Sequence, residues 1–114
     1  MLRPVLCGKF FLTLFCIVLG GPLLAAQLTP EQQAAKERGI ILYNQHKAIS
    51  AEPYLKVAAE AGDRDAQYYL GEAIRFNKRY MTVEAYRWYV AAAEQGDMYA
   101  MRRLANASGD LCNA

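Results

Sequence analysis

The sequence predicts an all-α fold built from helical hairpins, on the evidence of a repeat, of helix starts and of helix ends. Residues 54–63 (YLKVAAEAGD) reappear in altered form as residues 88–97 (WYVAAAEQGD), 34 positions later. An offset of this size is typical of helix pairs that stack on the next pair. In the second copy Gly96 is placed to end one helix and Asp97 to cap the next, and the first copy ends in the same dipeptide.

The first helix is predicted over residues 30–44. Thr29 can cap it, Gln32 stands three residues further on as in a capping box, and a proline suits the first helical position. Arg38 stands where the next repeat has Leu70. We therefore expect the first helix of the stack to be partly exposed.

A turn over residues 44–47 precedes the second helix, which is predicted to end at Ala61. Pro53 constrains where this helix begins. Inside a helix a proline costs about 3 kcal/mol, but within the first turn it is tolerated. The pattern therefore favours Ser50 as the cap over an earlier start at Ala48.

Three further helices are predicted over residues 64–76, 83–95 and 97–107, the first of them capped by Asp63 and the second by Thr82. The last of these has no partner helix after it, so we expect it to act as the terminal cap of the stack. Trp88, Tyr54 and Leu70 are expected to fill the gaps between layers, because alanine and glycine let the backbones approach closely. The predicted core positions are Ala66, Tyr69, Leu70, Ala73, Ile74, Ala85, Trp88, Tyr89 and Ala92.

These motifs resemble the Sel1-like repeat family. The resemblance rests on WYxxAAEQGD and on the A-x-x-x-L-G spacing of Ala66, Leu70 and Gly71, and it covers roughly residues 34–107. It implies an α/α solenoid of about two hairpins plus a C-terminal capping helix, and a protein that binds other proteins. Some members carry a cysteine pair in each repeat, and this chain has none, so no enzymatic role follows from the resemblance.

A stripe of basic and tyrosine side chains is the candidate binding site. In solenoids of this kind the first helix of each hairpin lines the concave surface. Tyrosine and arginine are enriched among the residues that dominate protein interfaces. The alternative interpretation is an ordinary solvated face. Projected through the repeat offsets, the stripe consists of Lys36, Tyr43, Tyr68, Arg75 and Arg102.

The first 26 residues have the layout of a secretory signal peptide, with basic Arg3 and Lys9, an apolar run and small residues before Gln27. The uncharged span of 17 residues is shorter than the roughly 20 that a membrane helix needs. We therefore expect periplasmic localisation with no stable membrane insertion after cleavage. The predicted organisation is a signal peptide (1–26), a lead-in (27–33), the repeat domain (34–107) and a C-terminal tail (108–114).

Removal of that segment leaves eleven basic and eleven acidic residues, so no basic field favours nucleic acid. It also leaves Cys112 as the one remaining cysteine. An exposed lone thiol can link two molecules through the tail, whereas a buried one is inert, and both alternatives stay open.

No constellation of residues predicts catalysis, a metal site or a cofactor. His46 is the one histidine, falls in a predicted loop and has no triad partner, and its spacing from Cys112 fits no metal site. The sequence therefore predicts a non-enzymatic interaction module, with an envelope adaptor or scaffold as the leading interpretation. The alternative is an immunity protein that binds and neutralises a secreted toxic effector in the periplasm.

Overall fold

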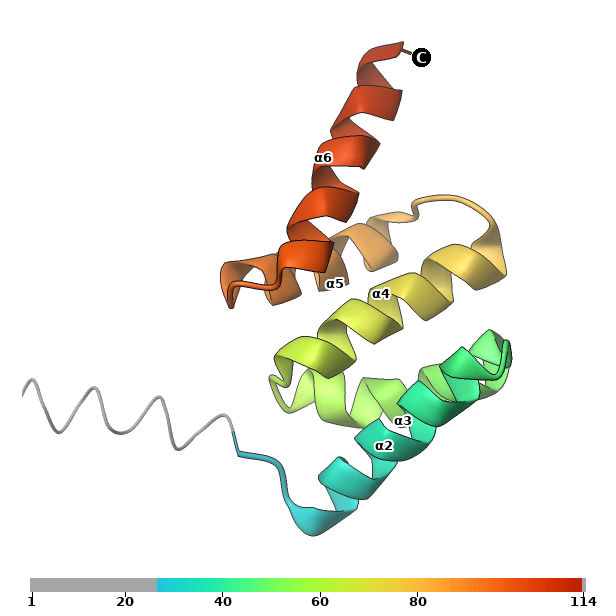
Figure 1. Cartoon of the computed structure of the whole chain (residues 1–114), viewed down its shortest axis with the longest axis vertical. Helices are drawn as coiled ribbons and strands as arrows, with labels where there is room; N and C mark the ends of the chain where they lie inside the picture. Colours follow the sequence, from blue (N-terminus) through green and yellow to red (C-terminus); the bar gives the residue numbers. More distant parts are fainter. Residues whose placement is uncertain (1–26, 114) are drawn as a thin grey trace, which may run out of the picture.

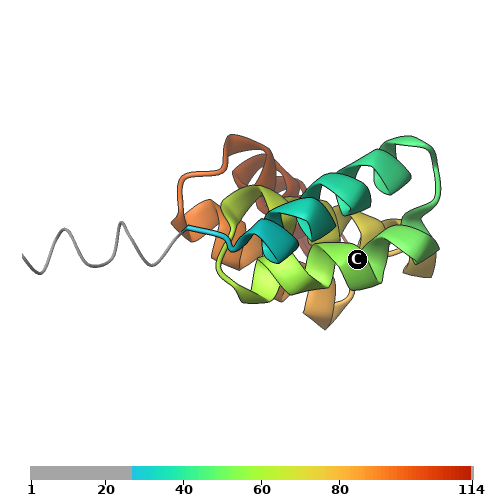
Figure 2. The same cartoon turned by 90° about the horizontal axis from the view of Figure 1, so that it is seen from below.

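The computed structural model describes the backbone of residues 27–113 and the side chains as far as Ser108, and this part of the chain is all-helical (Figure 1). The predicted signal peptide lies outside the described residues. Each helix packs against the next along the chain, and α2 and α3 run side by side in both views (Figure 1 and Figure 2). The helices are α2 (Pro30–Asn44), α3 (Ala48–Glu60), α4 (Arg64–Lys78), α5 (Val83–Glu94) and α6 (Met98–Asn113).

Side chains cap four of the five helices at their first turns, as predicted. Thr29 Oγ1 accepts the Gln32 N–H at 3.2 Å, and Gln32 Oε1 accepts the Thr29 N–H at 2.9 Å, which completes the capping box. Each such bond satisfies an amide that has no partner within the helix. The equivalent bonds join Asp63 to Ala66, Thr82 to Ala85 and Asp97 to Ala100, at 2.8 to 3.0 Å.

Helices α2, α3 and α5 end in the same kind of turn, each with a left-handed residue, and two of these three residues are the predicted glycines. Gly62 has φ 95° and Gly96 has φ 91°, a region that suits a residue without Cβ. His46 takes the same place after α2, with φ 63°, and is exposed. In all three turns the amide two residues beyond the helix cap bonds back into the last turn: Lys47 to Leu42, Asp63 to Ala58 and Asp97 to Ala92.

Helix α3 begins at Ala48, so the preference for Ser50 as its cap was wrong. Pro53 lies inside the helix, and Lys47 makes no side-chain capping bond. The physical reason is burial, because Ala48 and Ala51 are only 3% and 0% exposed. The packing of these two alanines at the start of the helix outweighs the loss of the hydrogen bond that the proline removes.

Helices α4 and α6 run further than the sequence suggested. Helix α4 ends at Lys78, and the next residue, Arg79, adopts φ 73°. Helix α6 continues to Asn113 instead of ending near Ala107, so residues 108–113 of the predicted tail are helical. The Ser108 hydroxyl donates to the Leu104 carbonyl at 3.0 Å and is thereby satisfied within the helix. The predicted Cys112 link lies outside the described side chains.

Glycine lets the two helices of each hairpin approach closely. A Cβ on Gly39 would lie 2.6 Å from Leu55 Cγ, and a Cβ on Gly71 would lie 3.1 Å from the Tyr89 ring. Leu55 and Tyr89 are both 0% exposed and stand 34 residues apart. The same contact therefore occurs in both hairpins, which is compatible with a helical repeat.

The predicted core is confirmed in α4 and at Ala85, Tyr89 and Ala92 of α5, but two of the three residues expected to fill the gaps between layers are misplaced. Leu70 is buried as expected. Tyr54, however, is 42% exposed, and Trp88 packs against the core while only partly buried. Their neighbours Leu55 and Tyr89 fill the space between the layers instead. The glycines of the facing helices select these positions, since a side chain must occupy the room that each glycine leaves.

Candidate protein-binding groove

Helices α2, α4 and α6 border an open groove of about 690 Å³. These are the first helices of the two hairpins and the helix that follows them. The residues that line it include Ile40, Tyr43, Tyr68, Tyr69, Glu72 and Tyr99. We call this surface the tyrosine groove.

A chain of four tyrosine rings crosses the groove from α2 to α6. The rings of Tyr43 and Tyr69 meet edge to face with centroids 5.5 Å apart, and Tyr69 meets Tyr68 in the same way at 5.4 Å. Tyr68 in turn lies 5.8 Å from Tyr99. Aromatic pairs at these separations attract each other beyond the area they bury. The rings therefore hold three helices together while leaving part of their surface in the groove, where Tyr99 is 60% exposed.

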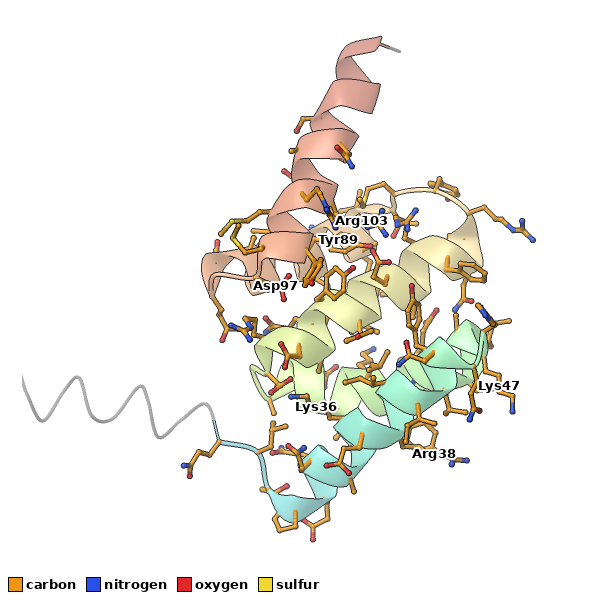
Figure 3. All side chains as sticks on the ribbon, in the orientation of Figure 1. Lys36, Arg38, Lys47, Tyr89, Asp97 and Arg103 are labelled. Carbon is orange, nitrogen blue, oxygen red and sulfur yellow. The ribbon has the colours of Figure 1, made fainter. Side chains whose placement is uncertain are left out.

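A buried carboxylate, Glu72, holds side chains of this surface in place through hydrogen bonds and is only 3% exposed. Its Oε1 accepts hydrogen bonds from Tyr89 Oη at 2.6 Å and from Arg103 Nε at 2.6 Å. Its Oε2 accepts from Tyr43 Oη at 3.1 Å and from Arg103 Nη2 at 3.0 Å. Figure 3 shows Arg103 of α6 and Tyr89 of α5 meeting beside α4. One side chain thus joins α2, α4, α5 and α6.

The pKa of the Glu72 carboxyl is lowered by its partners. Burial by itself raises the pKa of a carboxyl. The hydrogen bonds from Arg103 and Tyr89, together with the charges of Arg103 and Arg75, outweigh burial and place the pKa of Glu72 below its ordinary value of 4.5. At neutral pH the carboxylate is therefore the charged acceptor at the centre of the network.

The hydroxyls around Glu72 are correspondingly hard to ionise. Burial, followed by the charge of Glu72, raises the pKa of Tyr43 to about 12. Burial and the hydrogen bond to Glu72 raise the pKa of Tyr89 further. Burial and the Glu72 charge also raise the pKa of Tyr68. These phenols are donors that hold a carboxylate, and none has the lowered pKa of an activated nucleophile or base.

We expect stability to depend on pH through Glu72. Because its folded pKa lies below 4.5, its stabilising effect is complete above that value and is lost as the pH falls through the folded pKa. The difference in unfolding free energy between the wild type and Glu72→Gln should therefore be constant near neutral pH and shrink in acid. Urea unfolding followed by circular dichroism over a pH series measures it.

The matched control is Glu94→Gln, since Glu94 is exposed and makes no ion pair with any described residue. The unfolding free energy of that variant should differ little from that of the wild type across the pH series. A Glu72→Gln difference that persists unchanged to the lowest pH at which the protein folds would contradict the assignment.

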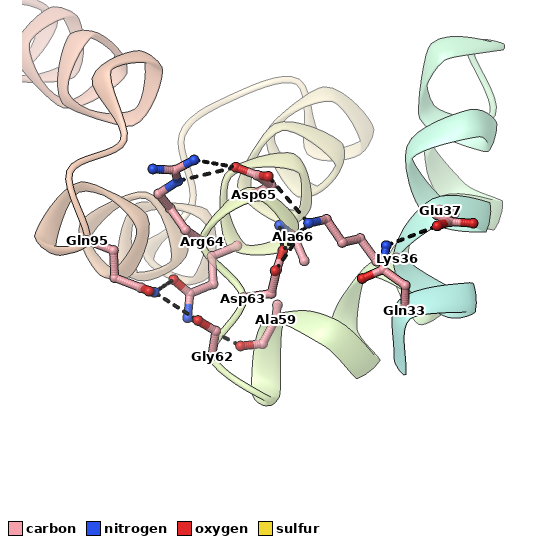
Figure 4. Close-up of polar contacts among 11 residues, drawn as sticks. Gln33, Lys36, Glu37, Ala59, Gly62, Asp63, Arg64, Asp65, Ala66 and Gln95 are labelled. Atoms are coloured by element: carbon pink, nitrogen blue, oxygen red, sulfur yellow. Dashed lines mark hydrogen bonds and ion pairs between the residues drawn. The ribbon is translucent and has the colours of Figure 1, made fainter. Parts of the chain in front are cut away.

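Lys36, one of the predicted stripe residues, forms ion pairs with two carboxylates (Figure 4). Its Nζ lies 3.1 Å from Asp63 Oδ2 and 3.3 Å from Asp65 Oδ2, so it ties α2 to the start of α4. Burial lowers the pKa of Lys36, but the hydrogen bonds and charges of the two aspartates outweigh it and raise the pKa overall. Its charge is therefore already paired within the protein.

The other four predicted residues fall into two groups. Tyr43 and Tyr68 line the tyrosine groove. Arg102 lies beside it, with its guanidinium carbon 5.6 Å from the centre of the Tyr99 ring. Arg75 is not among the lining residues and donates to the hydroxyl of the buried Tyr89. The structure therefore brings the tyrosines together but separates them from Arg75.

Sequence reasoning missed the residues that organise the groove, namely Glu72, Arg103 and Tyr99. Repeat projection did not identify them, because the counterpart of Tyr68 in α6 is Arg102 while the side chain that meets Tyr68 is Tyr99. The available signal was an acid at position 72 that follows Tyr68 and Tyr69 by one helical turn and precedes Arg75 by another. A buried carboxylate needs cationic or hydroxyl partners, and Arg103 on the next first helix could have been proposed as one.

The described residues hold no arrangement suited to a metal, because they contain no group of three or more histidine, cysteine, aspartate or glutamate side chains placed to share an ion. None of the helices over residues 27–113 combines the length and apolar character needed to cross a membrane. Comparison of the chain with family models, with curated proteins and with solved structures finds no match.

Proposed function

We propose that this chain is a non-enzymatic protein-binding module, exported to the periplasm, where it serves as an adaptor or scaffold. We further propose that its hairpins stack as an α/α solenoid of the Sel1-like kind. The observation that carries the function is the chain of tyrosine rings across α2, α4 and α6. The repeated contacts of Gly39 with Leu55 and of Gly71 with Tyr89 support the solenoid.

The composition of the groove favours a polypeptide ligand. Tyrosine offers a rigid ring for apolar contact and a hydroxyl for hydrogen bonding, and it loses little conformational entropy on binding. Arg64 and Asp65 add polar groups of both signs at one end, and Met98, which is 74% exposed, adds an apolar contact. An aromatic centre with a polar rim is the usual anatomy of a protein interface.

A small-molecule site is the weaker interpretation of the same groove. Its volume of about 690 Å³ is within the range of ligand pockets. Such pockets, however, enclose most of the ligand surface, whereas this groove is open along three helices. An extended segment or a helix of a partner protein can lie in an open groove and still bury its apolar side chains.

The first experiment identifies the partner through the groove itself. A photo-crosslinking amino acid in place of Tyr99 should capture a protein from envelope extract, and mass spectrometry then names it. The matched control carries the crosslinker in place of Arg87, an exposed residue of α5. Capture of a toxic enzyme would indicate the immunity role, and capture of an envelope component the adaptor role.

With the partner in hand, Tyr99→Ala is expected to weaken the complex by more than about 1 kcal/mol, because truncated tyrosines in interface centres commonly cost this much or more. Its melting temperature should stay close to that of the wild type, since Tyr99 is 60% exposed. Isothermal titration calorimetry and thermal unfolding measure the two quantities. Loss of binding in Arg87→Ala with none in Tyr99→Ala would place the interface on another face.

A further inference from the structure

A second groove of about 840 Å³ lies between the end of α4, the following loop and α6. It begins where the tyrosine groove ends. Glu72 lines the first groove, and both Arg75 and Arg103, which contact Glu72, line the second. We call this second surface the arginine groove.

The arginine groove carries excess positive charge. Arg75, Arg79 and Arg103 line it, and none of the described side chains that line it is acidic. Arg75 and Arg103 share the single carboxylate of Glu72, at 3.7 Å and 2.6 Å. Arg79 is exposed and forms no ion pair with any described residue. Three guanidinium charges against one carboxylate leave these described side chains with a net charge of about +2.

Exposed apolar side chains stand beside these arginines. Tyr80 is 64% exposed, Val83 69% and Tyr86 44%, and all three line the groove. Lone exposed apolar residues need no explanation, but a contiguous patch marks an interaction site. Arginine and tyrosine are also the residues most enriched in interface centres.

We propose that the arginine groove binds an acidic segment of a partner protein, one whose aspartate or glutamate residues flank an apolar side chain. Guanidinium groups match carboxylates in pairs of parallel hydrogen bonds, so the arginines select for acidic residues. The wall of Tyr80, Val83 and Tyr86 supplies contact area that a simple anion cannot use. A nucleic acid fits less well, because basic and acidic residues are balanced in number beyond residue 26.

The proposal rests on the proposed protein-binding function, but it concerns residues outside the tyrosine groove. The probe is a fluorescent synthetic peptide of glutamates around one phenylalanine and one leucine. The matched peptide has glutamine in place of every glutamate. The first peptide should raise fluorescence anisotropy and shift the NMR signals of the Arg79 side chain, with an affinity that falls as salt is added. The second should do neither.

Two variants of one residue test the charge. Arg79→Glu is expected to weaken peptide binding at least about tenfold, because a like charge then faces the ligand, and Arg79→Gln should weaken it less. Arg38→Glu is the matched control, since Arg38 is an exposed arginine on α2 and lies outside the groove. Tyr80→Ala should also weaken binding. All four variants should keep the wild-type melting temperature to within a few degrees.

Several outcomes would overturn the proposal. The glutamine peptide could bind equally well, or inorganic phosphate could shift the Arg79 signals as strongly as the acidic peptide, which would leave a simple anion site. Equal losses in Arg79→Glu and Arg38→Glu would indicate non-specific attraction. Tyr99→Ala separates the two proposals, because it should weaken binding of the captured partner and leave binding of the peptide unchanged. If the peptide binds while no partner crosslinks at Tyr99, the proposal that the tyrosine groove binds a protein is wrong, and the proposal for the arginine groove stands.

Discussion

Replacing Glu72 by alanine is expected to lower the free energy of unfolding by about 3 kcal/mol, the lower end of the range for breaking a buried ion pair. The substitution removes the acceptor of two buried hydroxyls, Tyr43 and Tyr89, and of the Arg103 guanidinium. Water partly screens Arg103, whose side chain is 38% exposed, and this keeps the cost from being larger. Urea unfolding followed by circular dichroism measures the loss.

A double-mutant cycle separates the ion pair from the hydroxyl bonds. If Arg103 is the main partner of Glu72, the cost of Glu72→Ala should be smaller in an Arg103→Ala background than in the wild type. Glu94→Ala, on an exposed site of α5, is the control and should change stability little. Equal costs for Glu72→Ala and Glu94→Ala would mean that Glu72 is not the centre of a buried network.

Replacing Glu72 should also weaken binding in the tyrosine groove. Tyr68 and Tyr69 belong to α4, while Tyr99 belongs to α6. Glu72 links these two helices through the two hydrogen bonds that Arg103 donates. When that link is cut, α6 keeps its packing against α5 but loses its fixed position beside α4. We therefore expect conditions that protonate Glu72 to weaken binding in the groove as well as stability.

The parts of the fold that local chemistry decides could be predicted from the sequence. Helix caps at Thr29, Asp63 and Asp97 and left-handed ends at Gly62 and Gly96 depend on residues within one turn of each other. For this reason the order of the helices and most of their bounds are confirmed. The all-helical class of residues 27–113 follows from the same signals.

Features that depend on packing between helices could not be predicted in the same way. Trp88 and Tyr89 are adjacent aromatic residues, so periodicity alone does not say which faces inward, and the space beside Gly71 decides it. The start of α3 was misplaced for a related reason, because the rule for Pro53 is local whereas the burial of Ala48 is not. In both cases tertiary contacts overrode a valid local preference.

The tyrosine groove shows the same limit. Projection through the repeat placed Tyr43 and Tyr68 together because α2 and α4 are equivalent helices in successive hairpins. Projection onto α6 selected Arg102, but the ring that meets Tyr68 belongs to Tyr99. A repeat offset gives equivalent positions on each helix and says nothing of how a terminal helix is rotated against its neighbour. Only the contacts of α6 with α4 and α5 fix that rotation.

Tyr89→Ala is expected to be at least as destabilising as Glu72→Ala, with a loss of about 3–5 kcal/mol, the usual range for emptying a buried aromatic site. Tyr89 is 0% exposed and is the largest fully buried side chain among the described residues. Its hydroxyl also donates to Glu72 and accepts from Arg75. Trp88→Ala should cost less, because Trp88 is only partly buried. A larger loss for Trp88 than for Tyr89 would mean that Trp88, and not Tyr89, fills the space between the layers.

The contact between Tyr89 and Gly71 allows a sharper test, in which one substitution changes the sign of its effect. In the wild type, Gly71→Ala should destabilise, because its Cβ would lie 3.1 Å from the Tyr89 ring. In a Tyr89→Val background the ring is absent, and the same substitution should stabilise by up to about 1 kcal/mol, since alanine favours a helix over glycine by that amount. Urea midpoints of the four proteins decide it. Should Gly71→Ala cost the same in both backgrounds, the two residues do not touch, and the close approach of α4 and α5 that they define is wrong.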